Sequence, residues 1–456
     1  MIRMPNLLNN VRGVAIRTFC ILLVNFGAVH AGHPNIVLIM ADDLGYGDLS
    51  CYDGWIKTPN IDALAESGIR FTDFHTSGSV CSPTRAGLLT GRYQQRAGIG
   101  GVVYARLDAE QHYHGLQKSE YTLAEMCREQ GYRTAIFGKW HLGYYRPYNP
   151  VNHGFDVFRG YVSGNVDFFS HVDQAGVFDW WHNEQQVEEE GYTTHLITKH
   201  AVEFIESSDE TPFFLYVPHE APHYPYQGPA DSPIRKIGST EKLKGERTDI
   251  KNAYLEMVTE MDKGVGEIIS VLGRTGKLDN TIVIFMSDNG ANKNGSNGQY
   301  RGFKGSVWEG GHRVPAIITW PDRIKPDVVS KFFTSLDWMP TLTAILKGKA
   351  EEGNPFDGVN QKGLLLSGRG GSAKDRVFVW NGNAVRRGSY KWVMEKGNEF
   401  LFNLKKDPSE SSNIIGEFPE LAKELKKLAQ QWKDEMVETA SKQPTKNELF
   451  ELLNNP

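Results

Sequence analysis

The stretch with the most distinctive chemistry runs from Cys81 to Arg92 and has the sequence Cys-Ser-Pro-Thr-Arg-Ala-Gly-Leu-Leu-Thr-Gly-Arg. Pro83 suits the first turn of a helix, so we expect Cys81 at a helix N-terminus, where the partial positive charge favours an anionic group. Arg85 follows four residues after Cys81 and falls on the same helical face. An isolated cysteine is more often a small buried apolar residue, but this arrangement favours a chemical role for Cys81.

Polar side chains also follow four apolar stretches that are typical of buried strands, at residues 36–40, 134–137, 213–217 and 281–286. In α/β proteins, ligands bind outside the carboxyl ends of such strands. One acidic strand end would be explained by a turn or a helix cap, but four converging polar ends predict a site. The residues are Asp42-Asp43, Lys139-Trp-His141, His219 to His223, and Ser287-Asp288-Asn289-Gly290.

The elements that must position these side chains alternate along the chain. Continuous apolar runs are interleaved with helical patterns at 60–66, 121–130 and 250–272, and a further strand is expected over 69–74. This alternation predicts an α/β fold with a large, mostly parallel sheet sandwiched by helices. Residues 142–212 are aromatic-rich with weak periodicity, so we expect long loops over the strand ends or a satellite hydrophobic cluster beneath them. We expect residues 228–251 to form a charged, solvated loop.

The pattern changes after about residue 350. Four short apolar segments between residues 376 and 402 predict an antiparallel meander, and an amphipathic helix is expected over 418–437. The predicted organisation is a leader at 1–31, an α/β domain at 32–350 that carries the candidate site, and a small C-terminal domain at 351–456. In that small domain, antiparallel strands are expected to pack on a helix.

The first 31 residues predict a cleaved secretory signal. Three arginines precede or flank an apolar run at 19–24, and Val29 and Ala31 are small enough for cleavage after Ala31. A membrane anchor is the alternative, but about 12 mostly apolar residues interrupted by Asn25 are short for a span. We therefore expect a secreted or periplasmic protein with no stable membrane insertion after cleavage.

The composition of the 456-residue chain is that of a large acidic globular protein. Its 40% hydrophobic and 23% charged residues exclude disordered and fibrous classes. The net charge of −5, or −8 without the three arginines of residues 1–31, argues against a nucleic-acid partner. Four cysteines are too few for a disulfide scaffold, and removal of Cys20 with the signal leaves an odd number in an exported protein.

The segment from Cys81 to Arg92 resembles the signature of the type I sulfatases, within the alkaline phosphatase superfamily. Further blocks are similar to motifs of that family and follow its order, at residues 35–45, 137–143, 221–225 and 287–315. Tail segments 385–391 and 404–410 are similar to the family's small C-terminal domain. The resemblance spans residues 34–438 and implies a sulfuric ester hydrolase that acts on sulfate monoesters.

The resemblance also implies how the nucleophile arises. Cys81 would be converted to formylglycine by a formylglycine-generating enzyme, which recognises the pattern Cys-x-Pro-x-Arg. A hydrated aldehyde offers one hydroxyl to attack sulfur and a second whose deprotonation expels sulfate, whereas a thiol lacks the second group.

A metal site is implied by the same resemblance. Its ligands would be Asp42, Asp43, residue 81 as formylglycine, Asp288 and Asn289. Carboxylate and amide oxygens favour a hard cation, and the usual ion of the family is Ca²⁺. A strand-end cap for Asp42-Asp43 and a turn for Asp288-Asn289 are the structural alternatives.

Five cationic or titratable residues complete the site that the resemblance implies. Lys139 and Arg85 would hold the aldehyde hydrate and its oxyanion, and His141 would be the base that deprotonates the second hydroxyl. His223 and Lys304 would grip the sulfate and help to protonate the leaving oxygen, so that Lys139, His223 and Lys304 also bind substrate. Ser163 is a further candidate for sulfate contact. Structural roles are expected for His171, His195 and His219.

A sulfated carbohydrate is the expected substrate, because aromatic loops can stack on sugar faces. Two alternatives remain: a phosphoester hydrolase on the same fold, and a non-catalytic Ca²⁺-dependent carbohydrate-binding protein. After conversion of Cys81, Cys51 and Cys127 could pair or stay free.

Overall fold

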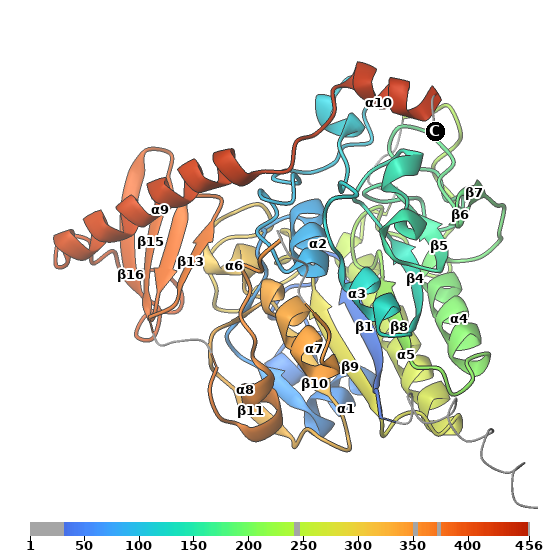
Figure 1. Cartoon of the computed structure of the whole chain (residues 1–456), viewed down its shortest axis with the longest axis horizontal. Helices are drawn as coiled ribbons and strands as arrows, with labels where there is room; N and C mark the ends of the chain where they lie inside the picture. The colour runs from blue at the N-terminus through green and yellow to red at the C-terminus, as the bar shows by residue number, and fades with distance from the viewer. Residues whose placement is uncertain (1–31, 241–246, 350–353, 372–374, 455–456) are drawn as a thin grey trace, which may run out of the picture.

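A computed structural model describes residues 32–240, 247–349, 354–371 and 375–454. The predicted signal at 1–31 lies outside the described residues. Within them, ten strands form one sheet in the order β11-β2-β10-β9-β1-β8-β4-β5-β6-β7 (Figure 1). β9, β1, β8, β4 and β5 are parallel, whereas β10, β6 and β7 run antiparallel to their neighbours. The predicted α/β fold with a large, mostly parallel sheet is therefore confirmed.

The strands of this sheet are short and mostly buried. Their bounds are β1 (Asn35–Ala41), β2 (Ile69–Phe71), β4 (Arg133–Lys139), β5 (Val157–Tyr161), β6 (Trp181–His182), β7 (Gln185–Gln186), β8 (Phe213–Pro218), β9 (Thr281–Ser287), β10 (Ala316–Thr319) and β11 (Asp327–Val329). A separate parallel pair joins β3 (Phe74–His75) to β12 (Phe333–Thr334).

Helices cover both faces of the large sheet. One face packs against α2 (Cys81–Thr90), α3 (Leu123–Glu129), α7 (Trp338–Leu346) and α8 (Lys362–Ser367). The other packs against α1 (Pro59–Ser67), α4 (Thr193–Glu206) and α5 (Ile250–Arg274). β1 is therefore buried on both faces: Ile36 and Leu38 belong to the core on the α2 side of the sheet, and Val37 and Ile39 belong to the core on the α5 side. A strand buried on both faces needs a continuous apolar run, which is why these strands were recognisable in the sequence.

A four-stranded antiparallel sheet forms the C-terminal part of the molecule. It contains β13 (Val377–Trp380), β14 (Ala384–Arg387), β15 (Tyr390–Glu395) and β16 (Asn398–Asn403), and it packs on α9 (Pro419–Thr439) around its own core. After α9 the chain returns to the large sheet's side of the molecule, where α10 (Lys446–Asn454) places Leu449 against Tyr113 and Tyr148 (Figure 1). The expected meander and helix are thus present.

Two local expectations are wrong in part. The single strand expected over 69–74 is divided into β2 and β3, because Asp73 between them turns to ion-pair with Arg386 at 2.7 Å. The segment expected to consist of loops at 142–212 contains β5, β6, β7 and α4. α4 buries Leu196, Ile197, Ala201, Phe204 and Ile205, a helical spacing that could have revealed it.

The loop expected to be solvated at 228–251 is partly buried, since Arg235 is only 2% exposed and its carbonyl accepts a hydrogen bond from Ser170. Short 3-10 turns lie at Ser50–Tyr52, Glu110–Tyr113, Arg146–Tyr148, Pro150–His153 and Ser335–Asp337, and a further short helix, α6, at Glu309–His312. Among the described helices, none is long and apolar enough to cross a membrane. Cys51 and Cys127 are both unpaired.

Candidate active site

The four polar strand ends predicted from the sequence lie side by side. β9, β1, β8 and β4 are consecutive neighbours in the sheet, so their carboxyl ends meet at one edge. Backbone hydrogen bonds hold these ends in register: Asp42 donates to Ala221, His219 to Met40, and Asp288 to Ala41, at 2.8 to 3.1 Å. The polar residues that follow the strands are therefore fixed by the sheet itself.

A cavity of about 910 Å³ opens at this edge. Five of the predicted site residues line it, namely Asp43, Cys81, His141, His223 and Lys304. Asp42, Arg85, Lys139, Asp288 and Asn289 lie directly behind that wall and are 0% exposed. The structure thus brings together all of the predicted residues except Ser163.

Cys81 is the first residue of α2 and is 3% exposed. Its Sγ lies 3.2 Å from Lys304 Nζ and 3.6 Å from Asp42 Oδ1. Burial raises the pKa of the Cys81 thiol to about 12, although Lys139 and Lys304 act to lower it. The thiol is therefore neutral at physiological pH, and a neutral thiol is a poor nucleophile.

Cations and carboxylates alternate behind Cys81. Lys139 Nζ lies 2.5 Å from Asp42 Oδ2, and Lys304 Nζ lies 2.6 Å from Asp43 Oδ1. Arg85 forms a 2.9 Å ion pair with Asp288 and also donates to the carbonyl of Lys139. Burial alone would raise the pKa of Asp43, but Lys304 and His223 hold it well below the usual value.

The oxygen atoms at the strand ends fit a hard divalent cation. One potential ligand atom each from Asp42, Asp43, Cys81 and His223 lies within 4.8 Å of the others. Asn289 donates through Nδ2 to Asp43 at 2.8 Å, and its buried Oδ1 has no hydrogen-bond partner among the described residues. Burial and the neighbouring Asp42 raise the pKa of Asp288, as expected where carboxylates crowd together. An unpartnered amide oxygen beside crowded carboxylates suits Ca²⁺ better than Zn²⁺.

The surroundings of His141 fix the protonation of its ring. Its Nε2–H donates to the carbonyl of Val103 at 2.9 Å, and Gly164 packs so closely that a Cβ there would lie 2.8 Å from Nε2. Burial, with the nearby charges of Lys139 and Arg85, holds the pKa of His141 well below its ordinary value. The neutral ring therefore carries its lone pair on Nδ1, which has no partner among the described residues.

His223 faces the same cavity from the segment after β8. Its Nδ1–H donates to the carbonyl of Tyr224 at 2.7 Å, and its Nε2 lies 3.9 Å from Asp43. Burial and the charge of Lys304 lower the pKa of His223 to about 3. Nε2 is therefore the ring atom directed toward the charged groups.

The remaining predicted residues lie elsewhere. Ser163 is buried outside the cavity lining, and its hydroxyl donates to the carbonyl of Asn165 at 3.1 Å. His195 pairs with Glu260 at 2.9 Å, His171 stacks on Trp180, and His219 is buried; none of the three lines the cavity.

Several cavity residues were not found from the sequence. Asn292 donates to Asp43 at 3.3 Å, and its position three residues after Asn289 in the same polar loop is a signal that could have found it. The others come from loops without a recognisable spacing: Tyr104, Arg106, Asn165, Gln174, Tyr226 and Lys293.

Comparison with known proteins agrees with this geometry. The family model described as Sulfatase matches residues 34–348. N-acetylgalactosamine-6-sulfatase of Mus musculus is 34% identical over 410 residues, which cover 83% of this chain and 75% of the relative. Arylsulfatase A of Homo sapiens is 32% identical over 471 residues, covering 90% and 89% of the two chains. A solved structure of Ps i-CgsB in complex with k-i-k-neocarrahexaose superposes with a TM-score of 0.78 at 29% identity, covering 88% of this chain and 93% of that one.

The fold and the site thus define a hydrolase of sulfuric esters. The chain belongs to the sulfatase family, as a type I sulfatase.

Proposed function

We propose that this sulfatase hydrolyses sulfate monoesters of a carbohydrate through a formylglycine derived from Cys81, with Ca²⁺ in the site. The observation that carries the proposal is the position of residue 81. It begins α2 on the wall of the cavity, with Sγ 3.2 Å from Lys304 Nζ and 3.6 Å from Asp42 Oδ1. A thiol at this position lacks the second group that would release sulfate after attack. A hydrated aldehyde at this position would supply two hydroxyl groups, one for attack and one for release of sulfate.

His141 acts as the general base in this proposal. His141 lines the same cavity as Cys81, its Nδ1 has no hydrogen-bond partner among the described residues, and its lowered pKa keeps that atom unprotonated at neutral pH. Accepting a proton from the second hydroxyl would promote loss of sulfate from residue 81.

In this proposal, the negative charge of the sulfate and of the attacking oxygen is stabilised by four side chains: Lys139, Arg85, Lys304 and His223. Lys139 and Arg85 are fully buried and fixed by Asp42 and Asp288, so they provide positive charge beside residue 81 without reorganising. Lys304 and His223 line the cavity itself. Lys304 would hold the sulfate oxygens, and His223, neutral in the empty site, would take up a proton on Nε2 once the sulfate anion is bound and pass it to the leaving oxygen.

The calcium ion would be held by an oxygen of residue 81 and by the side chains of Asp42, Asp43, Asp288 and Asn289. When bound, the ion would polarise the sulfate ester and favour ionisation of an adjacent hydroxyl.

The carbohydrate class is supported by the relatives and by the cavity. One relative is named for N-acetylgalactosamine 6-sulfate, and the Ps i-CgsB structure contains a neocarrahexaose. Tyr104, Tyr224 and Tyr226 line the cavity beside the charged residues, and such rings present apolar faces with polar edges. Export through the leader at 1–31 and maturation by a formylglycine-generating enzyme belong to the same proposal.

Peptide mass spectrometry of the fragment that carries residue 81 tests the nucleophile. We expect the aldehyde mass in active protein, loss of turnover in Cys81→Ala with an unchanged melting temperature, and normal turnover in the matched control Cys51→Ala. Active protein that retains the cysteine would overturn the mechanism. Faster release of phosphate than of sulfate from the corresponding 4-nitrophenyl esters would instead favour a phosphoester hydrolase.

A further inference from the structure

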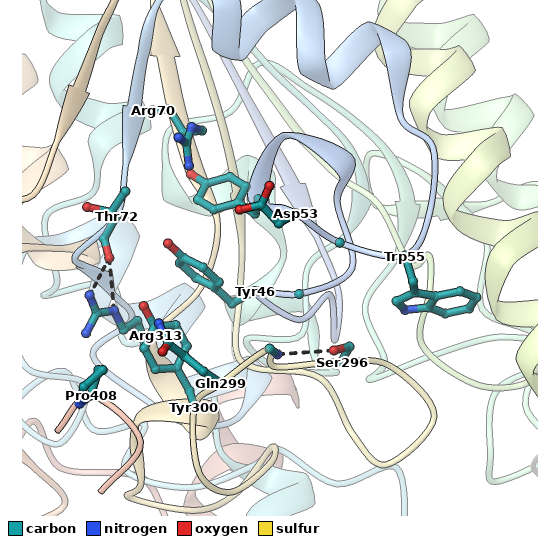
Figure 2. A pocket seen from close by; sticks show the side chains of 14 residues that line it. Tyr46, Asp53, Trp55, Arg70, Thr72, Ser296, Gln299, Tyr300, Arg313 and Pro408 are labelled. Carbon is teal, nitrogen blue, oxygen red and sulfur yellow. Dashed lines mark hydrogen bonds between the residues drawn. The ribbon is translucent and has the colours of Figure 1, made fainter.

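A second cavity of about 770 Å³ lies apart from the residues of the proposed reaction. It is bordered by β2, by the segments 46–55 and 296–300, and by Pro408 of the C-terminal part (Figure 2). Its wall combines aromatic rings with arginine: Tyr46, Tyr52, Trp55, Arg70, Tyr300 and Arg313. None of these residues lines the catalytic cavity.

Arg70 is the unusual member of this wall. It projects from β2 with its guanidinium over the ring of Tyr52, 5.1 Å from the centroid. Its side chain has no hydrogen bond or ion pair with any residue that the structure describes. A guanidinium has five donors in a planar fork suited to carboxylate or sulfate-like oxyanions, so an unpaired one on a cavity wall indicates an anion-binding position.

The second arginine of the wall shows the contrast. Arg313 ion-pairs with Glu309 at 3.1 Å, donates to the carbonyl of Thr72 at 2.6 Å, and lies 4.4 Å from the centroid of Tyr300. Its charge is already balanced within the fold. Arg70 is therefore the cation of this cavity that remains available to a ligand.

The aromatic part of the wall can accept a sugar. The ring of Tyr46 lies 4.8 Å, edge to face, from both Tyr52 and Tyr300. Tyr52 and Tyr300 are only 5% and 7% exposed, so Tyr46 is the ring of the three that is accessible to a ligand. Arg70 and Arg313 bring two positive charges to the cavity wall, and Asp53 brings one negative charge. Aromatic faces with a few convergent polar groups are typical of small-molecule sites.

The wall is also rigid and continuous with the catalytic site. Buried Asp48 accepts hydrogen bonds from Trp55, Tyr254 and the backbone of Ser296 at 2.6 to 2.8 Å. It thereby ties together the two segments that border both cavities. Each segment continues from a residue of the catalytic cavity: Asp43 lies three residues before Tyr46, and Asn292 lies four residues before Ser296.

We propose that the Arg70 cavity is an accessory site for sulfated oligosaccharides, in which Arg70 binds a sulfate of the chain and the ring of Tyr46, supported by Tyr52 and Tyr300, contacts a sugar ring. The inference rests on the proposed carbohydrate substrate and extends it to a substrate with more than one sulfated residue. Because the protein has a net charge of −5 and repels a polyanionic oligosaccharide overall, binding of such a ligand requires local positive charge.

Equilibrium binding to the Cys81→Ala protein tests the site without turnover. The probes are a chondroitin 6-sulfate hexasaccharide, a κ-carrageenan hexasaccharide, and unsulfated chondroitin hexasaccharide. We expect a sulfated hexasaccharide to bind and Arg70→Gln to raise its Kd about tenfold. Arg70→Lys, which keeps the charge but loses the fork, should give an intermediate Kd. The control is Arg128→Gln on α3, an exposed arginine outside both cavities, which should leave the Kd unchanged.

Kinetics of the variants with residue 81 intact separate this site from the catalytic one. Arg70→Gln should raise KM for the sulfated hexasaccharide while leaving kcat/KM for 4-nitrophenyl sulfate unchanged, which also shows that the variant is folded. Equal Kd values for the Arg70→Gln and parent proteins, or no binding of either sulfated probe, would overturn the accessory site. Absence of sulfate release from every ester would instead contradict the proposed function, and the binding comparison would still decide the role of Arg70.

Discussion

His141 illustrates how the environment of one side chain sets its chemistry. The carbonyl of Val103 fixes Nε2 as the protonated atom, and burial beside Lys139 and Arg85 disfavours a second proton. The imidazole is thereby held as a neutral base with Nδ1 free. The same surroundings keep the Cys81 thiol protonated, because there the loss of solvation outweighs the two nearby lysines.

We predict that His141→Gln lowers kcat for 4-nitrophenyl sulfate by a factor of about 100 or more, since general bases contribute on this scale. Because the pKa of His141 is lowered from its ordinary value near 6.5, protonation of this base should reduce kcat only below pH 6.5. Steady-state kinetics across pH 5 to 8 checks both points. His195→Gln, at an exposed histidine paired with Glu260, should be without effect. An acid limb of the parent enzyme centred above pH 6.5 would contradict this role for His141.

At the scale of elements, the contact between β4 and β5 positions Lys139. Gly138 and Gly160 lie opposite each other in the parallel register, one residue before Lys139 and Tyr161. Gly160 has a φ of 143°, and a Cβ there would lie 2.1 Å from the Gly138 carbonyl oxygen. Only glycine permits this close approach of the two backbones. The contact fixes the end of β4, where Lys139 lies beside Asp42.

We predict that Gly160→Ala destabilises the protein by about 2 kcal/mol or more, because both the φ angle and the backbone contact are violated. Urea denaturation followed by circular dichroism measures the change. The control is Gly273→Ala at an exposed position near the end of α5, where an added Cβ meets nothing within 4 Å. There the free energy of unfolding should rise by about 0.5 to 1 kcal/mol. Similar changes in the two variants would show that the β4–β5 contact does not depend on glycine.

At the scale of the whole molecule, buried charges join the C-terminal sheet to the large sheet. Arg386 of β14 binds Asp73 through both terminal nitrogens, and Lys391 of β15 binds Glu309 of α6 at 2.9 Å. Burial alone would raise the pKa of Asp73, but Arg386 and Arg313 hold it well below its ordinary value. α6 lies shortly after Lys304, so the C-terminal sheet braces the segment that supplies this cation to the site.

We predict that Arg386→Met destabilises the protein by about 3 kcal/mol, near the lower end of the cost of breaking a buried ion pair, because Asp73 keeps Arg313 at 3.5 Å and His75 at 2.9 Å. Arg387→Met, one residue away at an exposed pair with Glu424, should cost about 1 kcal/mol or less. Urea titrations of the two variants and the parent provide the comparison.

The pH dependence has a defined sign. A depressed carboxyl pKa in the folded state contributes stability that is present above the ordinary value of about 3.9 and is lost as pH falls below it. The difference between Arg386→Met and the parent should therefore shrink below about pH 4. A difference that stays constant down to pH 3 would show that Asp73 is not the partner responsible.

The sequence alone determined the central strands, because burial on both faces requires continuous apolar runs, and it determined the polar residues that follow them. The same argument missed α4, whose apolar spacing is interrupted by polar residues such as Thr198 and Lys199, and it extended one strand through Asp73. Asp73 leaves that strand for Arg386, 313 positions away, a partner that local pattern does not reveal.

The tertiary structure decided which polar residues share a site. One cavity wall contains Cys81, His141, His223 and Lys304. Ser163 lies outside this wall and donates a hydrogen bond to the carbonyl of Asn165, whereas Asn292, which the sequence did not predict, binds Asp43. The tertiary structure alone shows that Cys81 is buried among charged side chains and that Arg70, over the ring of Tyr52, has no ion pair with any described residue. Residue types and spacing are local properties that the sequence carries, whereas protonation, pairing and shared cavities depend on neighbours that only the folded chain brings together.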